Sequence, residues 1–294
     1  TKYSILQKLP FFKKLFDFFI FSNLFIALCT VIMLFYTGHL FKITLNPALF
    51  WFLFFATLAS YNLHWYLTDA SKEITVARSK WLTVNKKTHW MLFIFASIAG
   101  MIFGMRIISY WLLFLPLVFF TLLYTAPKFP HSIFKQLERH IIGKTFLLTL
   151  VWTYATAILP MLITSAEWTW LNTVFSIHRF TLIFPICILF DIRDKRADRI
   201  TGIKSIVTLL PAKTIRRIFN VFILLHLLTS ALAFFVKMDN FLIYITFLIP
   251  SIITYRLYPK AIKSTNAYLF YFVLDGLMIL APVCYFLIIL FQNI

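Results

Sequence analysis

Residues Phe190–Pro211 read FDIRDKRADRITGIKSIVTLLP and follow the almost unbroken apolar segment Phe180–Phe190. Within Asp191–Arg199, three aspartates, Asp191, Asp194 and Asp198, stand among four basic residues. If the helix predicted for the apolar segment continues, the three carboxylates lie within about 60° of one another, because a helix turns about 100° per residue. The stretch therefore predicts an acidic stripe at the end of an apolar helix.

The acidic stripe has two interpretations. Three carboxylates on one face repel one another, and a Mg²⁺ ion that bridges them to a diphosphate would relieve the repulsion. Alternatively, the stretch is a solvated helix end on which Arg and Asp side chains pair. The rest of the chain favours the first interpretation.

The composition indicates a polytopic α-helical membrane protein. Of the 294 residues, 61% are hydrophobic and only 13% are charged. Several segments run for about 18 or more residues almost without charge, which is long enough to cross a bilayer core of about 30 Å as helix. The net charge of +18 is scattered between these segments, which argues against binding to nucleic acid. No linker or soluble insertion interrupts the chain, so residues 1–294 are expected to form a single transmembrane domain.

We predict about nine membrane spans from the apolar segments. In chain order they are Phe16–Phe35, Pro47–Thr68, Trp90–Arg106, Ile108–Tyr124, Ile142–Ile163, Phe175–Phe190, Ile215–Val236, Phe241–Ile253 and Ala267–Phe291. The sixth span is expected to continue past Phe190 as a helix that projects from the membrane.

The basic residues fall mainly on one side of this arrangement. All but four of the 28 Lys and Arg residues lie at the N-terminus or after even-numbered spans. The four on the other side are Lys42, Arg106, Arg179 and Lys237. Since cytoplasmic connections are enriched in Lys and Arg, we expect the N-terminus and the acidic stripe to lie in the cytoplasm. The expected location is therefore multi-pass in a membrane, with the bacterial inner membrane as the expected one.

A second candidate site lies at the end of the second span, in SYNLHWYLTDASKE. Its members are Asn62, Tyr66, Asp69 and Glu73, which fall within about 60° on one helical face. A purely solvated role is an equal alternative, because basic residues nearby can pair with the two acids. Two acidic helix ends on the same side of the membrane, with basic loops above them, are what a site for Mg²⁺ and a diphosphate needs.

These residues resemble the UbiA superfamily of intramembrane prenyltransferases. Asp191, Asp194 and Asp198, followed by Gly202-x-Lys204-Ser205 and by Pro211, resemble the second aspartate-rich motif of that family. The stretch Tyr124-Thr-Ala-Pro127-Lys128 is also similar, and the helix with Asn62 stands where the first motif would lie. Span count, motif order and placement fit over nearly the whole chain.

The chain departs from the family in the first motif. The family usually places aspartates at the fourth and eighth positions after the asparagine, where this chain has Tyr66 and Ala70. Asp69 and Glu73 lie on the same face but out of register.

The resemblance implies an all-α bundle of the UbiA type that transfers a prenyl group from a prenyl diphosphate to an aromatic or lipid-like acceptor. The implied enzyme is a Mg²⁺-dependent prenyltransferase of lipid biosynthesis, open to the bilayer. The implied metal ligands are Asp191, Asp194, Asp198, Asn62, Asp69 and Glu73. Implied contacts of the diphosphate are Lys128, Arg193 and Lys204, with Arg78 and Lys80 as caps. Tyr66 and Tyr124 are the aromatic residues expected beside the allylic cation.

The sequence leaves two other functions open. A catalytically impaired relative that acts as a lipid-binding or assembly subunit would explain the altered first motif. A transporter is less favoured, because Asp275 is almost the only charge inside a span outside the motif helices, and no paired broken spans occur. For Asp275 itself we favour interhelical hydrogen bonding over a role as proton acceptor on the side of the acceptor substrate.

Overall fold

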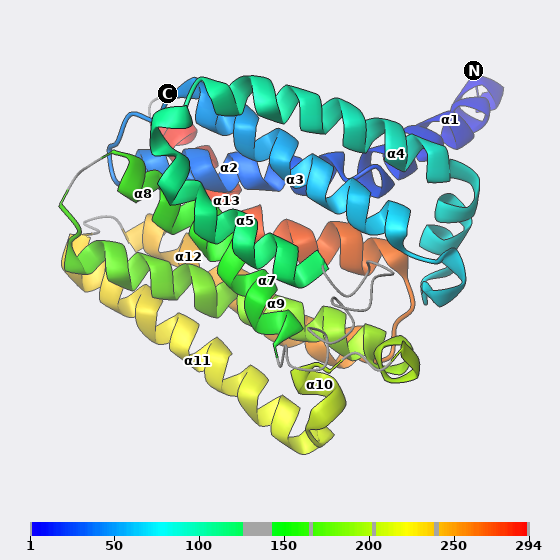
Figure 1. The fold of residues 1–294 in the computed structure, drawn as a ribbon. Coiled ribbons are helices and arrows are strands. Elements are labelled where there is room, and N and C mark those ends of the chain that lie inside the picture. The colour runs from blue at the N-terminus through cyan, green and yellow to red at the C-terminus, as the bar shows by residue number, and fades with distance from the viewer. Residues whose placement is uncertain (1, 126–142, 165–166, 202–203, 238–240, 293–294) are drawn as a thin grey trace.

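The computed structural model describes residues 2–125, 143–164, 167–201, 204–237 and 241–292, and they form helices without any strand (Figure 1). The first part comprises α1 (Lys2–Phe21), α2 (Leu24–Leu40), α3 (Pro47–Leu67), η1 (Ala70–Lys72), α4 (Val76–Met105), η2 (Ile108–Tyr110) and α5 (Trp111–Thr125). Next come α7 (Lys144–Thr153), the π-helix η4 (Tyr154–Ile158), α8 (Leu159–Ile163) and α9 (Trp170–Thr201). The chain ends with α10 (Ile206–Leu209), α11 (Ala212–Lys237), α12 (Phe241–Ala261), the π-helix η5 (Leu269–Leu274) and α13 (Asp275–Gln292).

Within the described residues, six helices are long and apolar enough to cross a membrane. They are Val76–Met105, Ile108–Thr125, Lys144–Ile163, Trp170–Ile200, Ala212–Leu232 and Leu269–Phe291. A bent pair of helices, Phe11–Phe21 and Leu24–Leu40, raises the number to seven if it counts as one span. The predicted all-α fold is therefore confirmed for the described residues, and its long apolar helices are consistent with a multi-pass membrane protein. The count of nine spans stays a prediction.

The first predicted span, Phe16–Phe35, is wrong as a continuous helix. The chain breaks between α1 and α2, which meet at an angle of 61°. Asn23 occupies the left-handed region with φ 69°, a conformation that asparagine adopts more readily than most residues. The break exposes backbone carbonyls, and side chains from elsewhere bind them: Arg78 donates to Phe21 O at 2.7 Å and Asn62 donates to Ser22 O at 3.0 Å. A break in an apolar bundle is tolerated when its freed backbone groups are satisfied in this way.

Helix α9 is the central helix of the bundle. It packs against α7, α10, α11, α12, α13 and η4. In its most apolar part 78% of the residues are buried, compared with 11% for the span that contains α5. Ile183, Ile188 and Leu189 of α9 are completely buried, whereas Leu112 and Leu122 of α5 are exposed. An exposed apolar surface of this kind suits contact with lipid, so α5 lies at the periphery and α9 in the interior.

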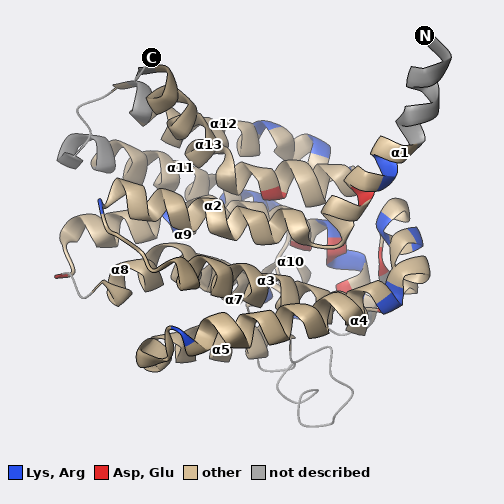
Figure 2. Cartoon of the chain, turned by 90° about the horizontal axis from the view of Figure 1, so that it is seen from above, with Lys and Arg blue, Asp and Glu red and all other residues tan. Residues whose placement is uncertain are grey.

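The charged residues concentrate at one end of the bundle. Figure 2 shows Lys, Arg, Asp and Glu gathered around the start of α4 and around α10, while the other end carries few. As predicted, α9 continues as a helix beyond Phe190, through the acidic stretch to Thr201. The acidic stripe therefore lies on helix α9 at the charged end of the bundle.

Candidate functional site

The three aspartates of α9 converge on one lysine. The Nζ atom of Lys144, the first residue of α7, lies 3.6 Å from Asp191 Oδ1, 3.9 Å from Asp194 Oδ2 and 3.4 Å from Asp198 Oδ2. Helical spacing alone brings the carboxylates to one face, and the packing of α7 against α9 brings the ammonium to that face. The predicted acidic stripe exists, and the cation that its three carboxylates share is the Lys144 ammonium.

Two further side chains hold these carboxylates in place. The Thr145 hydroxyl donates a hydrogen bond to Asp191 Oδ2, and Asp191 is buried. Arg193 binds Asp194 through both oxygens, with Nε–Oδ1 at 2.7 Å and Nη2–Oδ2 at 3.1 Å. Fork-to-fork pairs of this type are among the stronger charged hydrogen bonds. The Arg193 guanidinium also lies over the rings of Phe270 and Tyr271 at 4.7 and 4.9 Å, so the pair with Asp194 is fixed against η5.

The two acids after α3 are also hydrogen-bonded. Asp69 caps the short helix η1 by accepting from Ser71 N at 3.0 Å. Glu73 accepts from Thr75 N at 2.9 Å and from the Tyr271 hydroxyl at 3.2 Å. Tyr271 thus lies between Glu73 on one side and Arg193 on the other, which links the second acidic group to the first.

One cavity joins both acidic groups. It has a volume of about 890 Å³ and is lined by residues of α2, α3, α5, α7, α9, η5 and α13 together with the connections at their charged ends. Its charged wall consists of Asp69, Glu73, Lys144, Asp191, Arg193, Asp194, Asp198 and Lys204. Residues farther along the helices, among them Ile26, Phe52, Leu53, Val118 and Val151, line an apolar continuation. The cavity is therefore charged at one end and mainly apolar farther along the helices.

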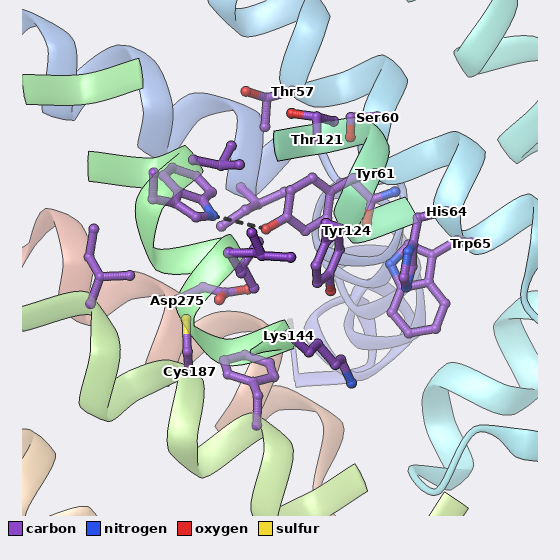
Figure 3. A pocket seen from close by; sticks show the side chains of 18 of the residues that line it. Thr57, Ser60, Tyr61, His64, Trp65, Thr121, Tyr124, Lys144, Cys187 and Asp275 are labelled. Carbon is purple, nitrogen blue, oxygen red and sulfur yellow. Dashed lines mark hydrogen bonds between the residues drawn. The ribbon is translucent and has the colours of Figure 1, made fainter. Parts of the chain in front are cut away.

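Uncharged polar groups line the zone between these two parts (Figure 3). Tyr61 accepts a hydrogen bond from Trp152 Nε1 at 3.2 Å, and Tyr124 stacks on His64 with ring centroids 5.5 Å apart. Figure 3 shows Tyr61, Tyr124, Asp275 and Lys144 extending into the same space. No hydrogen bond or ion pair from another described residue reaches the Asp275 carboxylate, so the interhelical hydrogen bond expected for it is not found in this part of the chain.

The structure brings most of the predicted site residues together. Those that line the cavity are Asp69, Glu73, Tyr124, Asp191, Arg193, Asp194, Asp198 and Lys204. Four predicted residues, Asn62, Tyr66, Arg78 and Lys80, are not part of the cavity wall. Lys128 lies outside the described residues.

Asn62 and Arg78 belong to the packing around the helix break. Asn62 is completely buried, donates to Ser22 O and Leu58 O at 3.0 and 2.8 Å, and lies with its Oδ1 2.6 Å from His89 Nδ1. Arg78 is also completely buried, and its guanidinium lies 4.1 Å from the centre of the Trp65 ring. The single helical face predicted for Asn62, Tyr66, Asp69 and Glu73 is wrong, because α3 ends at Leu67 and both acids lie in extended backbone on either side of η1. Asn62 itself packs against the helix break and α4 instead of opening into the cavity.

Tyr66 and Lys80 lie on the outer side of the same region. The Tyr66 ring packs on Trp90 with centroids 4.9 Å apart, and the Lys86 ammonium lies 5.5 Å from its centre. Lys80 is exposed. Neither side chain is in position to contact a ligand in the cavity as it is formed here.

The donor chemistry of the cavity wall fits Mg²⁺. Six carboxylates line the cavity, all but Asp275 at its charged end, and Mg²⁺ prefers hard oxygen ligands while keeping several waters. Lys144 shows that three of these carboxylates can approach a single cation at once. In the arrangement described here that cation is the ammonium, and no three His, Cys, Asp or Glu side chains among the described residues are arranged as a ready metal site.

Lys144 is the main residue that the sequence interpretation did not assign to the site. Lys144 follows the basic connection after the fourth predicted span and falls inside the predicted fifth span, Ile142–Ile163. A charge within a span is a signal of function, since such a group requires a partner or a polar cavity. The same signal applied to Asp275, which the structure places on the cavity wall.

Comparison with known proteins adds no assignment, because no protein-family model, curated protein or solved structure matches the chain. The resemblance to the UbiA superfamily therefore stays a prediction that depends on the motif residues.

Proposed function

We propose that the protein is a membrane prenyltransferase that moves a prenyl group from a prenyl diphosphate to a hydrophobic acceptor, either aromatic or lipid-like. The observation that supports it is the single cavity that begins between two groups of acids and continues between apolar helices. Its volume of about 890 Å³ lies within the range usual for small-molecule sites. A ligand with a highly charged head and a long apolar tail matches both parts of such a cavity.

The charged end would bind the diphosphate. Asp191, Asp194 and Asp198, with Asp69 and Glu73 opposite, would hold Mg²⁺, which when bound neutralises the diphosphate and stabilises it as a leaving group. Lys144, Arg193 and Lys204 line the same wall and would donate to diphosphate oxygens. Lys128 is the remaining basic residue of the proposed site.

The apolar part would hold the prenyl chain and exclude water. In the transfer, the bond between the prenyl C1 and the diphosphate oxygen breaks, and its electron pair leaves with pyrophosphate. The acceptor supplies an electron pair to C1 and releases a proton. Tyr61 and Tyr124, which line the middle of the cavity, would face the allylic carbon, where an aromatic ring attracts positive charge by about 0.5–2 kcal/mol.

The orientation in the membrane belongs to the same proposal. With the charged end of the bundle in the cytoplasm, as the distribution of Lys and Arg indicates, a soluble prenyl diphosphate enters from that side. The acceptor reaches the apolar part of the cavity from the bilayer. A bacterial inner membrane would provide this arrangement.

A double substitution tests the proposal. Membranes that contain Asp191→Asn/Asp194→Asn protein should not transfer label from prenyl diphosphates of several lengths into the lipid phase, whereas wild-type membranes should do so only with Mg²⁺. Asp17→Asn is the matched control, because Asp17 accepts from the Tyr268 hydroxyl and is not part of the cavity wall. Undiminished transfer by the double variant would reject the assignment.

A lipid-binding or assembly subunit without catalysis is the second candidate. It is favoured by two observations: Lys144 already balances the aspartates, and Tyr66 and Ala70 replace the aspartates of the first motif. This candidate predicts a stoichiometric partner on purification and no heat of binding when a prenyl diphosphate is titrated. Binding at micromolar affinity contradicts it.

A further inference from the structure

We propose that Lys144 is a tethered counter-ion of the site. In the ligand-free protein its ammonium occupies the space between the three aspartates, and when a metal–diphosphate complex binds, the ammonium moves to the diphosphate oxygens. The inference rests on the proposed function and deepens it, because it states how the site admits its metal: together with the diphosphate and not before it.

The position of Lys144 is built into the start of α7. Gly143 precedes it with φ 146°, a backbone conformation that residues with a side chain rarely adopt. A Cβ at Gly143 would also lie 3.4 Å from Phe146 Cβ. Thr145, the next residue, donates to Asp191. Two successive residues of α7 therefore bind the acidic stripe, and a glycine turn directs the chain into that position.

The distances indicate a shared contact. The separations of 3.4, 3.6 and 3.9 Å are longer than the roughly 2.7–2.9 Å of a direct charged hydrogen bond. An ammonium has three donors and no preferred plane, so it can stay between three carboxylates without forming a tight pair with any of them. The Lys144 side chain is 22% exposed, and it lines the cavity. It can therefore reach a ligand without leaving its place on α7.

The charges explain why the metal needs the diphosphate. The positive charge of Arg193 balances the negative charge of Asp194, and the charge of Lys144 balances that of one other aspartate. The acidic stripe therefore retains about one negative charge. A divalent cation that entered alone would be placed beside the ammonium and repelled by it. A diphosphate gives the ammonium a new partner and frees the carboxylates.

Arg193 is a second group that could bind the diphosphate. Its Nη1 atom is buried and lacks a hydrogen-bond partner among the described residues, and the side chain lines the cavity wall.

Metal binding to purified protein in detergent tests this role without any assay of transfer. Mn²⁺ is titrated alone, with the free ion followed by electron paramagnetic resonance, and then with inorganic pyrophosphate present. Lys144→Met should bind Mn²⁺ alone about tenfold or more tightly than wild type, and should bind it more weakly than wild type once pyrophosphate is present. Lys144→Arg keeps the charge and should stay close to wild type in both titrations.

Two further variants separate this role from simple loss of structure. Lys144→Gln has a polar side chain of similar length and should behave like Lys144→Met if the methionine variant does not fold. Lys144→Met/Asp198→Asn removes one charge of each sign and should return the affinity for Mn²⁺ alone to near the wild-type value. An affinity for Mn²⁺ alone that is unchanged or weaker in folded Lys144→Met or Lys144→Gln would overturn the inference.

The Mn²⁺ titrations and the prenyl-transfer assay test separate claims, so one can fail while the other succeeds. If the Mn²⁺ affinities change as expected but wild-type membranes transfer no prenyl group, the role of Lys144 stands and prenyl transfer is rejected. If transfer occurs and the Mn²⁺ affinities do not change, prenyl transfer stands and the counter-ion role is rejected.

Discussion

Replacing Arg78 by methionine should destabilise the junction of four helices. The Arg78 guanidinium donates to Phe21 O at 2.7 Å and to Asn23 Oδ1 at 3.1 Å, on either side of the break between α1 and α2. It also lies 4.1 Å from the centre of the Trp65 ring of α3. Methionine fills a similar space but leaves the carbonyl at the break without this donor.

The size of the effect follows from these contacts. A hydrogen bond from a charged donor contributes about 1.5–3 kcal/mol, and a buried cation over an aromatic ring contributes about 0.5–2 kcal/mol. Arg78 is completely buried, so the cost of removing its charge from water offsets part of the sum. We therefore expect Arg78→Met to lose about 3 kcal/mol of stability, which corresponds to a fall on the order of 5–10 °C in apparent Tm.

The measurement is thermal unfolding in detergent, with Arg216→Met as the matched control. Arg216 lies 3.9 Å from the centre of the Tyr258 ring but is only partly buried and makes no hydrogen bond to a described residue. Its replacement should cost about 0.5–1 kcal/mol. If Arg78→Met lowers the apparent Tm no more than Arg216→Met does, the argument that Arg78 stabilises the helix break is wrong.

Four other substitutions give separate tests. Asn62→Leu should cost about 2 kcal/mol in thermal unfolding, because Ser22 O loses its donor and His89 its partner; an unchanged Tm would contradict this. Tyr66→Phe should keep the rate of prenyl transfer within about twofold of wild type, since Tyr66 is not part of the cavity wall. A tenfold lower rate would show that Tyr66 belongs to the site. Glu73→Gln should weaken pyrophosphate-dependent Mn²⁺ binding, whereas no change would place this acid outside the metal site. Asp275→Asn should leave stability equal or higher, because the carboxylate has no hydrogen-bond partner among the described residues, and a clear fall in Tm would restore the interhelical role.

The apolar periodicity of the sequence was sufficient to place the helices. Each predicted span overlaps one helix or a run of consecutive helices, and the extension of α9 beyond Phe190 was predicted. The start of α4 at Val76, well before the predicted Trp90, was not. The acidic stripe of Asp191, Asp194 and Asp198 followed from helical spacing, because residues at these intervals share a face wherever the helix is placed. The positions of the helices and the acidic stripe both follow from local sequence patterns alone.

The break at Asn23 needed tertiary information. The sequence there reads as one apolar segment, and nothing within it requires a bend. Arg78 and Asn62, which bind the freed carbonyls, are 57 and 40 residues away along the chain. Since the stability of the break depends on donors supplied by other helices, a local pattern could not reveal it.

The sequence by itself determined a helical membrane protein with an acidic stripe at the end of its central helix. Only the tertiary structure decided which groups from elsewhere in the chain meet that stripe: Lys144 at its centre, and Glu73 across Tyr271. It also decided that Asn62 stabilises the fold and that Asp275 lines the cavity. The physical reason is that spacing along a helix sets the direction of a side chain, whereas its partner is set by the packing of helices distant in sequence.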